Sequence, residues 1–126
     1  MKQTLISLPN KIAPFRFKKV IFDIETEGLE GNIIHCIVAK VVGGETFLFT
    51  PDNLQEGVDL IESADVLIGH NIIGFDIPVL KKHFDLNLTN HIEDTLVVSR
   101  LVNPVLTGGH SLENWGYILY PNAADK

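Results

Sequence analysis

The chain has 126 residues, the size of one ordinary domain, and 45% of them are hydrophobic while 21% are charged, as in globular proteins. The formal net charge of −6 argues against a protein that holds nucleic acid mainly by neutralising phosphates with basic side chains. Cys36 is the only cysteine, which excludes a disulfide framework and favours a reducing compartment. No apolar run matches a signal peptide or a membrane span, so we expect a cytoplasmic protein without membrane contact.

Two segments are predicted: an N-terminal extension over residues 1–19 and one domain over residues 20–126. Pro9, Asn10 and Pro14 interrupt the first segment, which therefore has the character of an irregular lead-in. The acidic balance of the rest is compatible with action on a phosphodiester if bound metal ions cancel the charge of their ligands.

The organising stretch is the apolar run from Val20 to Ile24, which predicts a buried strand with Asp23 and Glu25 at its carboxyl end. Side chains alternate along a strand, so both carboxylates leave on the same side. Two anions beside each other need a positive partner, and divalent cations with oxygen ligands are the usual one. A strand that simply ends in solvated acids before Gly28 is an equally good interpretation of these two residues.

A hairpin is predicted next, with strands over residues 33–42 and 45–50 around a Gly43-Gly44 turn. Together with the first strand this gives three consecutive antiparallel strands. A helix is then expected to begin with Asp52 as N-cap and Gln55 at the capping-box position, and to end at residues 63–65.

The second informative stretch covers residues 66–80, where a short strand leads into a helix that begins just after Asp76, with Pro78 in its first turn. Asp76 either caps this helix or faces Asp23 and Glu25 across a crevice at the carboxyl edge of the sheet, where open α/β sheets bind ligands. Asn71 likewise either structures the loop or donates a hydrogen bond to a substrate.

Two more helices are predicted near the carboxyl end of the chain. Asp94 should cap a helix that starts at Thr95, and Ser111 should cap the last one. In that last helix Leu112, Trp115 and Leu119 recur at a spacing typical of a core-facing stripe.

These motifs resemble a known family. Asp23-x-Glu25 after an apolar strand, followed by Gly-His-Asn71-x-x-x-Phe75-Asp76, resembles the first two motifs of the DEDD-type 3′→5′ exonucleases. Residues 92–102 and residues 109–117, with their Ser-Leu-Glu-Asn-Trp-Gly run, are similar to the proofreading domain of phage family A DNA polymerases. The resemblance extends from about residue 20 to about residue 119.

The resemblance implies a ribonuclease-H-like α/β fold, with a mixed sheet of three antiparallel strands plus parallel strands, flanked by helices. It implies a two-metal site for Mg²⁺ or Mn²⁺ in which Asp23, Glu25 and Asp76 are both the ligands and the catalytic residues. The implied reaction is hydrolysis of phosphodiesters at the 3′ end of single-stranded DNA. Thr26, Asn71 and Phe75 match positions near the substrate strand, although packing in the core is the favoured role for Phe75.

One departure from the family pattern bears on activity. The family has a fourth carboxylate on a later helix, in a Tyr-x-x-x-Asp or His-x-x-x-x-Asp pattern, whereas Tyr117 leads here to Pro121, and Asp125 stands five positions after Tyr120. We therefore expect a domain that is incomplete at its C-terminus and lacks the last helix. The domain would then be a 3′→5′ exodeoxyribonuclease that is either weakly active alone or completed by a missing segment, a complementing chain or a DNA polymerase.

Two other functions stay open on the sequence. The first is a catalytically inactive exonuclease-like module that binds nucleic acid or a protein partner. The second is a phosphatase-like hydrolase, because the run Phe22-Asp23-Ile24-Glu25-Thr26 superficially resembles the Asp-x-Asp-x-Thr motif at the start of haloacid-dehalogenase enzymes. Glu25 stands there in place of the second Asp. That second interpretation leaves the stretch from Asn71 to Asp76 without a role.

Overall fold

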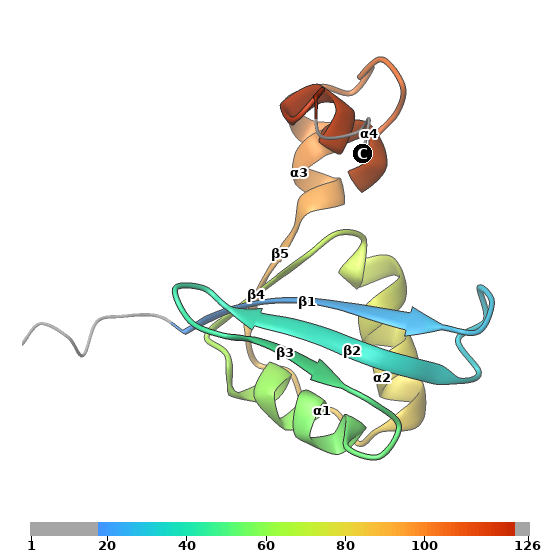
Figure 1. The fold of residues 1–126 in the computed structure, drawn as a ribbon, viewed down its shortest axis with the longest axis vertical. Helices are drawn as coiled ribbons and strands as arrows, with labels where there is room; N and C mark the ends of the chain where they lie inside the picture. Colours follow the sequence, from blue (N-terminus) through green and yellow to red (C-terminus); the bar gives the residue numbers. More distant parts are fainter. Residues whose placement is uncertain (1–17, 123–126) are drawn as a thin grey trace, which may run out of the picture.

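The computed structural model describes residues 18–122 and shows one mixed sheet with helices α1 and α2 packed on the same face (Figure 1). The sheet order is β3-β2-β1-β4-β5. The pairs β3–β2 and β2–β1 are antiparallel, and the pairs β1–β4 and β4–β5 are parallel. The predicted combination of antiparallel and parallel strands is therefore confirmed. The strands are β1 (Lys19–Thr26), β2 (Ile34–Val41), β3 (Thr46–Phe49), β4 (Val66–Gly69) and β5 (His91–Asp94).

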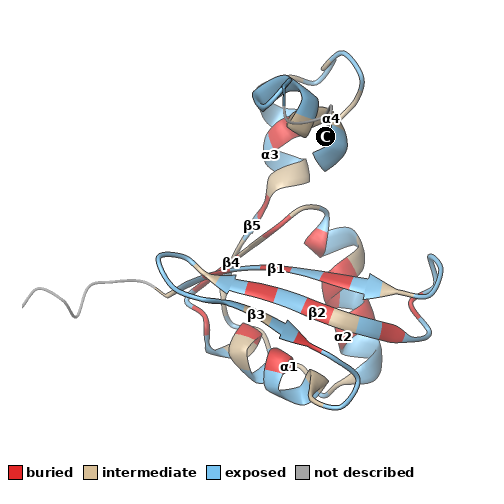
Figure 2. Ribbon diagram, viewed as in Figure 1, coloured by how far each residue is buried: buried red, intermediate tan, exposed pale blue. Residues whose placement is uncertain are grey.

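The predicted buried strand β1 is present, and it is buried on one face. Val20, Phe22 and Ile24 are buried in the core, while Asp23 and Glu25, at alternate positions, are exposed. Buried and exposed residues alternate along β1 in Figure 2. The alternation confirms that the two carboxylates share one side of the strand. They therefore lie on the open face of the sheet, opposite the face that α1 and α2 cover.

Helix α1 (Leu54–Ser63) follows the predicted hairpin but starts one residue later than expected. Its N-cap is Asn53 and not Asp52, and no side chain caps it. The Oδ1 atom of Asn53 instead accepts a hydrogen bond from the Thr50 amide at 2.7 Å, which closes the turn that leads out of β3. The local pattern at residues 52–55 could not distinguish these two neighbouring cap positions.

Gly57 permits α1 to approach the sheet closely, although glycine weakens a helix interior. A Cβ atom at this position would lie 2.8 Å from the ring of Phe49 and 3.2 Å from Ile37. The neighbouring Val58 and Ile61 are fully buried against the same sheet face. The absence of a side chain at Gly57 therefore serves core packing.

The segment after β4 forms a single π-helical turn, η2 (Ile72–Asp76), which continues directly into α2 (Ile77–His83). Pro78 lies at the start of α2, as predicted, where its missing amide hydrogen costs nothing. Asp76 does not cap α2 with its side chain, because its backbone already has helical angles as the last residue of the π turn. Its carboxylate is thus free for another contact.

Helices α3 (Thr95–Val102) and α4 (Leu112–Leu119) stand away from the sheet beyond the end of β5 (Figure 1). Both predicted caps are confirmed, since Asp94 accepts from the Leu96 amide and Ser111 accepts from the Asn114 amide. The predicted core stripe on α4 is wrong: this helix has no buried residue, and Leu112 and Leu119 are each 60% exposed. The amphipathic spacing is present, but the described residues supply no core for it to face.

Some predictions lie outside the described residues. Almost all of the expected N-terminal extension, residues 1–17, belongs to this group, and so does Asp125. Among residues 18–122, no helix has both the length and the apolar character needed to cross a bilayer.

Candidate active site

The carboxylate of Asp76 reaches back to the middle of β1. Its Oδ2 atom accepts a hydrogen bond from the backbone amide of Ile24 at 3.1 Å, across 52 residues of sequence. Ile24 lies between the two acids of the first motif, and the charge of Asp23 acts on Asp76, so these two carboxylates are neighbours at the sheet edge. The convergence of Asp23, Glu25 and Asp76 on one metal site stays a prediction.

The end of β4 explains why the Ile24 amide needs a side chain as its partner. Strand β4 pairs with β1 only from Lys19 to Ile21, after which β1 continues alone on that side. The Ile24 amide would therefore lack a ladder partner at a buried position. Asp76 occupies the place where the next strand residue would accept, and it fixes the π turn against β1.

The electrostatics of this point are unfavourable for two of the acids. Burial of Asp76, which is 3% exposed, raises its pKa to about 7; the amide of Ile24 counteracts this shift, and the charge of Asp23 adds to it. For Asp23, desolvation raises the pKa and the charge of Glu25 raises it further. The ion pairs found among residues 18–122 are two surface contacts between histidine and glutamate, and neither involves these acids.

The proposed substrate residues lie at the end of β1 and in the segment of the π turn. Thr26 follows a register irregularity of β1 and donates its hydroxyl to the Gly28 carbonyl at 2.9 Å. Asn71 is exposed and adopts a left-handed conformation with φ of 61°. Phe75 is half-buried against the core, as the packing interpretation predicted. A contact of any of the three with a substrate remains a prediction.

An open hollow of about 360 Å³ lies beside Asp23 on the exposed face of the sheet. Its walls include Ile21 and Val38 from the sheet and His70 and Leu112 from the segments above it. A second hollow of about 290 Å³, between α3 and α4, shares His70, Thr95 and Leu112 with the first. The two hollows thus adjoin each other at the junction of the sheet with the helix pair.

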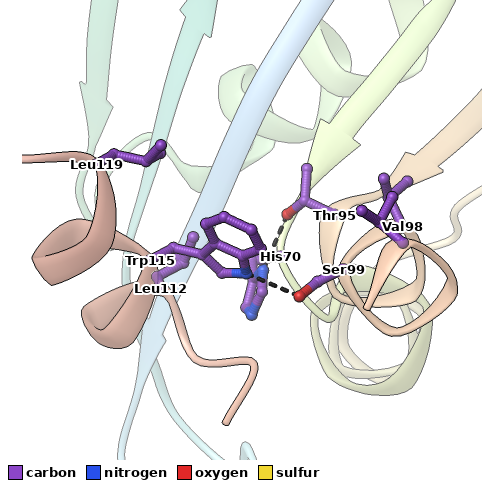
Figure 3. A pocket seen from close by; sticks show the side chains of 8 residues that line it. His70, Thr95, Val98, Ser99, Leu112, Trp115 and Leu119 are labelled. Atoms are coloured by element: carbon purple, nitrogen blue, oxygen red, sulfur yellow. Dashed lines mark hydrogen bonds between the residues drawn. The ribbon is translucent and has the colours of Figure 1, made fainter. Parts of the chain in front are cut away.

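Figure 3 shows how polar contacts fix this junction. The Nδ1 atom of His70 lies 2.9 Å from the hydroxyl of Thr95, which donates to the Gly69 carbonyl at 3.2 Å. The indole of Trp115 donates to the hydroxyl of Ser99 at 2.7 Å, which ties α4 to α3. These contacts anchor the His70 ring in the loop after β4, and its Nε2 atom is buried without a partner among the described residues.

The residues present fit a divalent cation by their chemistry. Three carboxylates supply hard oxygen ligands, and a buried acid with a raised pKa gains from a nearby positive charge. Within residues 18–122, however, no three His, Cys, Asp or Glu side chains are already arranged as a metal site. Occupation by metal would therefore require these side chains, two of which are exposed, to turn towards the ion.

Comparisons with known proteins show a nuclease fold. The chain is similar to an apo form of a nuclease with a TM-score of 0.66 and 22% identity, over 86% of this chain and 54% of that one. It is similar to NrnC of Brucella melitensis with a TM-score of 0.62 and 20% identity, over 90% of this chain and 57% of that one. A family B DNA polymerase of Pyrobaculum calidifontis gives a TM-score of 0.52 and 16% identity, over 79% of this chain and 21% of the polymerase.

Sequence comparison points to a polymerase as well. The chain is 29% identical over 132 residues to the PolC-type DNA polymerase III of Mycoplasma genitalium, a match that covers 75% of this chain and 9% of the polymerase. No family model matches the sequence. The chain thus spans about half of the solved nucleases and a small part of the polymerases. The comparisons show that the chain has the fold of these nucleases and a weak similarity to a DNA polymerase, and the mixed sheet is consistent with a ribonuclease-H-like architecture.

Proposed function

We propose that this chain is the exonuclease-like domain of a DNA polymerase system and that it hydrolyses phosphodiesters at the 3′ end of single-stranded DNA with the help of Mg²⁺ or Mn²⁺. The observation that carries the proposal is the return of Asp76 to the Ile24 amide, because it joins two distant motifs at one point. The nuclease neighbours support the reaction class, and the PolC-type relative supports a role beside a polymerase in replication and proofreading.

In this proposal Asp23, Glu25 and Asp76 hold the metal ions and are the catalytic residues. When bound, the ions would supply Lewis-acid stabilisation of the phosphoryl group and a more acidic water. In the overall hydrolysis a water oxygen forms a bond to phosphorus and the bond to the bridging 3′ oxygen breaks. The shortened strand keeps a 3′ hydroxyl, and a nucleoside 5′-monophosphate leaves.

The protein's own contribution is the placement of charge. Asp76 is held by the Ile24 amide, so its orientation is set before any ligand arrives. Asp23 lies on the open face of the sheet and borders the larger hollow. The 3′ end of a DNA strand could reach Asp23 there. Thr26, Asn71 and Phe75 lie on the segments that flank this point and are the proposed contacts to the terminal nucleotides.

Calorimetric titration with Mn²⁺ tests the metal site. The wild type should bind Mn²⁺ specifically, and Asp23→Ala should not. Glu27→Ala is the matched control, because Glu27 is an exposed acid just beyond β1. Equal, weak binding by the wild type and Asp23→Ala would show that these carboxylates are not a metal site.

Cleavage is tested separately with a 5′-labelled single-stranded oligonucleotide and Mn²⁺ or Mg²⁺. The wild type should shorten it stepwise, Asp76→Ala should not, and a 3′-phosphorylated oligonucleotide should be cut more slowly. Adding a polymerase chain from the same source tests whether a partner completes the site. Internal cuts, or products that Asp76→Ala also makes, would contradict the assignment.

A second candidate function is a module that binds a partner without catalysis, and the exposed apolar surface of α3 and α4 favours it. Large apolar side chains with more than two-fifths of their surface exposed cover both helices: Val97, Val98, Leu101, Val102, Leu112, Ile118 and Leu119. The adjoining sheet face also exposes Ile21 and Val38. A polypeptide helix with an apolar stripe suits this surface. Binding of DNA or of a polymerase by a wild-type protein that does not shorten the labelled oligonucleotide would select this function.

A further inference from the structure

Asp94, at the end of β5, is a buried carboxylate that binds backbone amides of two separate segments. Its Oδ1 atom accepts from the Asn71 amide at 2.7 Å and from the Leu96 amide at 2.9 Å. Its Oδ2 atom accepts from the Ile73 amide at 2.9 Å. The Leu96 contact is the ordinary cap of α3, but the contacts to Asn71 and Ile73 cross more than twenty residues to the start of η2.

The two distant contacts hold the part of the chain that determines where Asp76 lies. Amides at the start of a helical turn have no partner within the turn, and Asp94 satisfies those of Asn71 and Ile73. Asn71 also has a positive φ, a conformation that an L residue adopts at some cost and that needs support from its surroundings. The π turn that begins here ends at Asp76. Such turns are rare in proteins as a whole, and those that occur are often found at functional sites.

We propose that Asp94 is a positioning residue for the carboxylate site: it fixes the start of the π turn so that the end of the turn delivers Asp76 to the Ile24 amide. This inference rests on the proposed function for its catalytic consequence and on geometry alone for its structural one. Asp94 acts through the backbone of Asn71 and Ile73. Because the same Oδ1 atom caps α3, the carboxylate site and the exposed helix pair also share one anchor.

The charge state of Asp94 agrees with this role. Burial alone would raise the pKa of this carboxyl, but the backbone hydrogen bonds from Ile73, Asn71 and Leu96 outweigh it and hold the pKa below its ordinary value. Asp94 is therefore an ionised acceptor at neutral pH. Hydrogen bonds to a charged acceptor are stronger than those between neutral groups, which suits a residue that holds strained backbone.

The substitution Asp94→Asn separates the two roles of this side chain. The amide oxygen of asparagine can keep the contacts to Asn71 and Leu96, while its NH₂ group opposes the Ile73 amide, donor against donor. Asp94→Asn should therefore loosen the π turn and leave the cap of α3 in place. Ser111→Ala is the matched control, because it removes the cap of α4 in the same part of the chain without touching η2.

The first readout needs no metal and no activity. In the metal-free protein, hydrogen exchange of the Ile24 amide should be faster in Asp94→Asn than in the wild type, because its partner Asp76 is displaced, and it should be unchanged in Ser111→Ala. Thermal unfolding verifies that each variant is folded. Asp94→Ala removes all three contacts, so it should speed up exchange of the Ile24 amide more than Asp94→Asn does. Ile24 exchange at the wild-type rate in folded Asp94→Asn would overturn the inference.

The second readout is functional. Asp94→Asn should bind Mn²⁺ and cleave the 3′ end about 10- to 100-fold less well than the wild type, through kcat more than KM, as is common for residues that orient metal ligands. A wild type that neither binds nor cleaves would refute the proposed function, while the exchange of the Ile24 amide would still decide the role of Asp94. Wild-type Mn²⁺ affinity and kcat in Asp94→Asn would refute that role.

Discussion

Replacing Asp76 with asparagine should stabilise the metal-free protein above neutral pH and leave its stability almost unchanged in acid. The carboxyl of Asp76 is 3% exposed, and its pKa is raised from 3.8 to about 7, mainly by burial. Asparagine is neutral at every pH and keeps an oxygen that can accept from the Ile24 amide. It therefore removes the cost of the buried charge and preserves the contact that places it.

The magnitude follows from the difference in pKa between the folded and unfolded states. Below pH 3.8 the carboxyl is protonated in both states, so it carries no penalty. Between pH 3.8 and about 7 the unfolded chain releases the proton and the folded chain keeps it, so stability falls by about 1.4 kcal/mol per pH unit. Above pH 7 the accumulated penalty is about 4 kcal/mol.

Urea unfolding of the wild type and Asp76→Asn at pH 4.5 and pH 8.5 in EDTA measures this penalty. The gain from the substitution should be small at the lower pH and several kcal/mol at the higher one. Asp85→Asn, an exposed aspartate beyond the other end of α2, should give no such gain. A difference between wild type and Asp76→Asn that is small and independent of pH would refute the reasoning from burial.

The same pair of proteins tests the metal ion by its effect on stability. At pH 8.5 saturating Mn²⁺ should raise the unfolding midpoint of the wild type, since a ligand that binds only the folded state stabilises it, by about 2.7 kcal/mol at a hundred times Kd. Removing the ion with EDTA should reverse the shift. Asp76→Asn should respond much less, and equal responses would separate Mn²⁺ binding from Asp76.

Two further predictions concern packing. Gly57→Ala should destabilise the protein by about 1–3 kcal/mol, because the added methyl group meets the ring of Phe49. Gly116→Ala in α4 is the control: its methyl group meets nothing, so the change should be neutral or stabilising by up to about 1 kcal/mol. Equal effects of the two substitutions on urea unfolding would contradict this. Ser99→Ala should shift the fluorescence of Trp115, the only tryptophan, by removing the partner of its indole, and an unchanged spectrum would show that this contact does not form in solution.

The acid pair of the first motif illustrates how far a local pattern reaches. Alternation along a strand is a property of the backbone, so the shared side of Asp23 and Glu25 could be predicted from their spacing. Which face of the strand is covered depends on where helices pack, and the open face was not predicted. Hydrophobicity alone did not show it, because Ile21 is apolar and yet 41% exposed.

Helix ends show the same division. Ser111 and Asp94 were identified as caps because the cap contact lies within a few residues of sequence. The π turn and the further contacts of Asp94 were missed, since they join residues more than twenty positions apart. The apolar stripe on α4 was identified correctly as a spacing and wrongly as core, because a stripe specifies a face and not its partner.

By itself the sequence determined the strands of the hairpin, the shared side of the first two acids and the capped starts of the last two helices, since each depends on neighbours in the chain. The tertiary structure alone decided the role of Asp76. Strand β4 ends before Ile24, and the unpaired amide takes the carboxylate as its partner instead of leaving it to cap α2. Such a choice depends on which backbone groups the sheet leaves unsatisfied, and that is settled only when the strands pair.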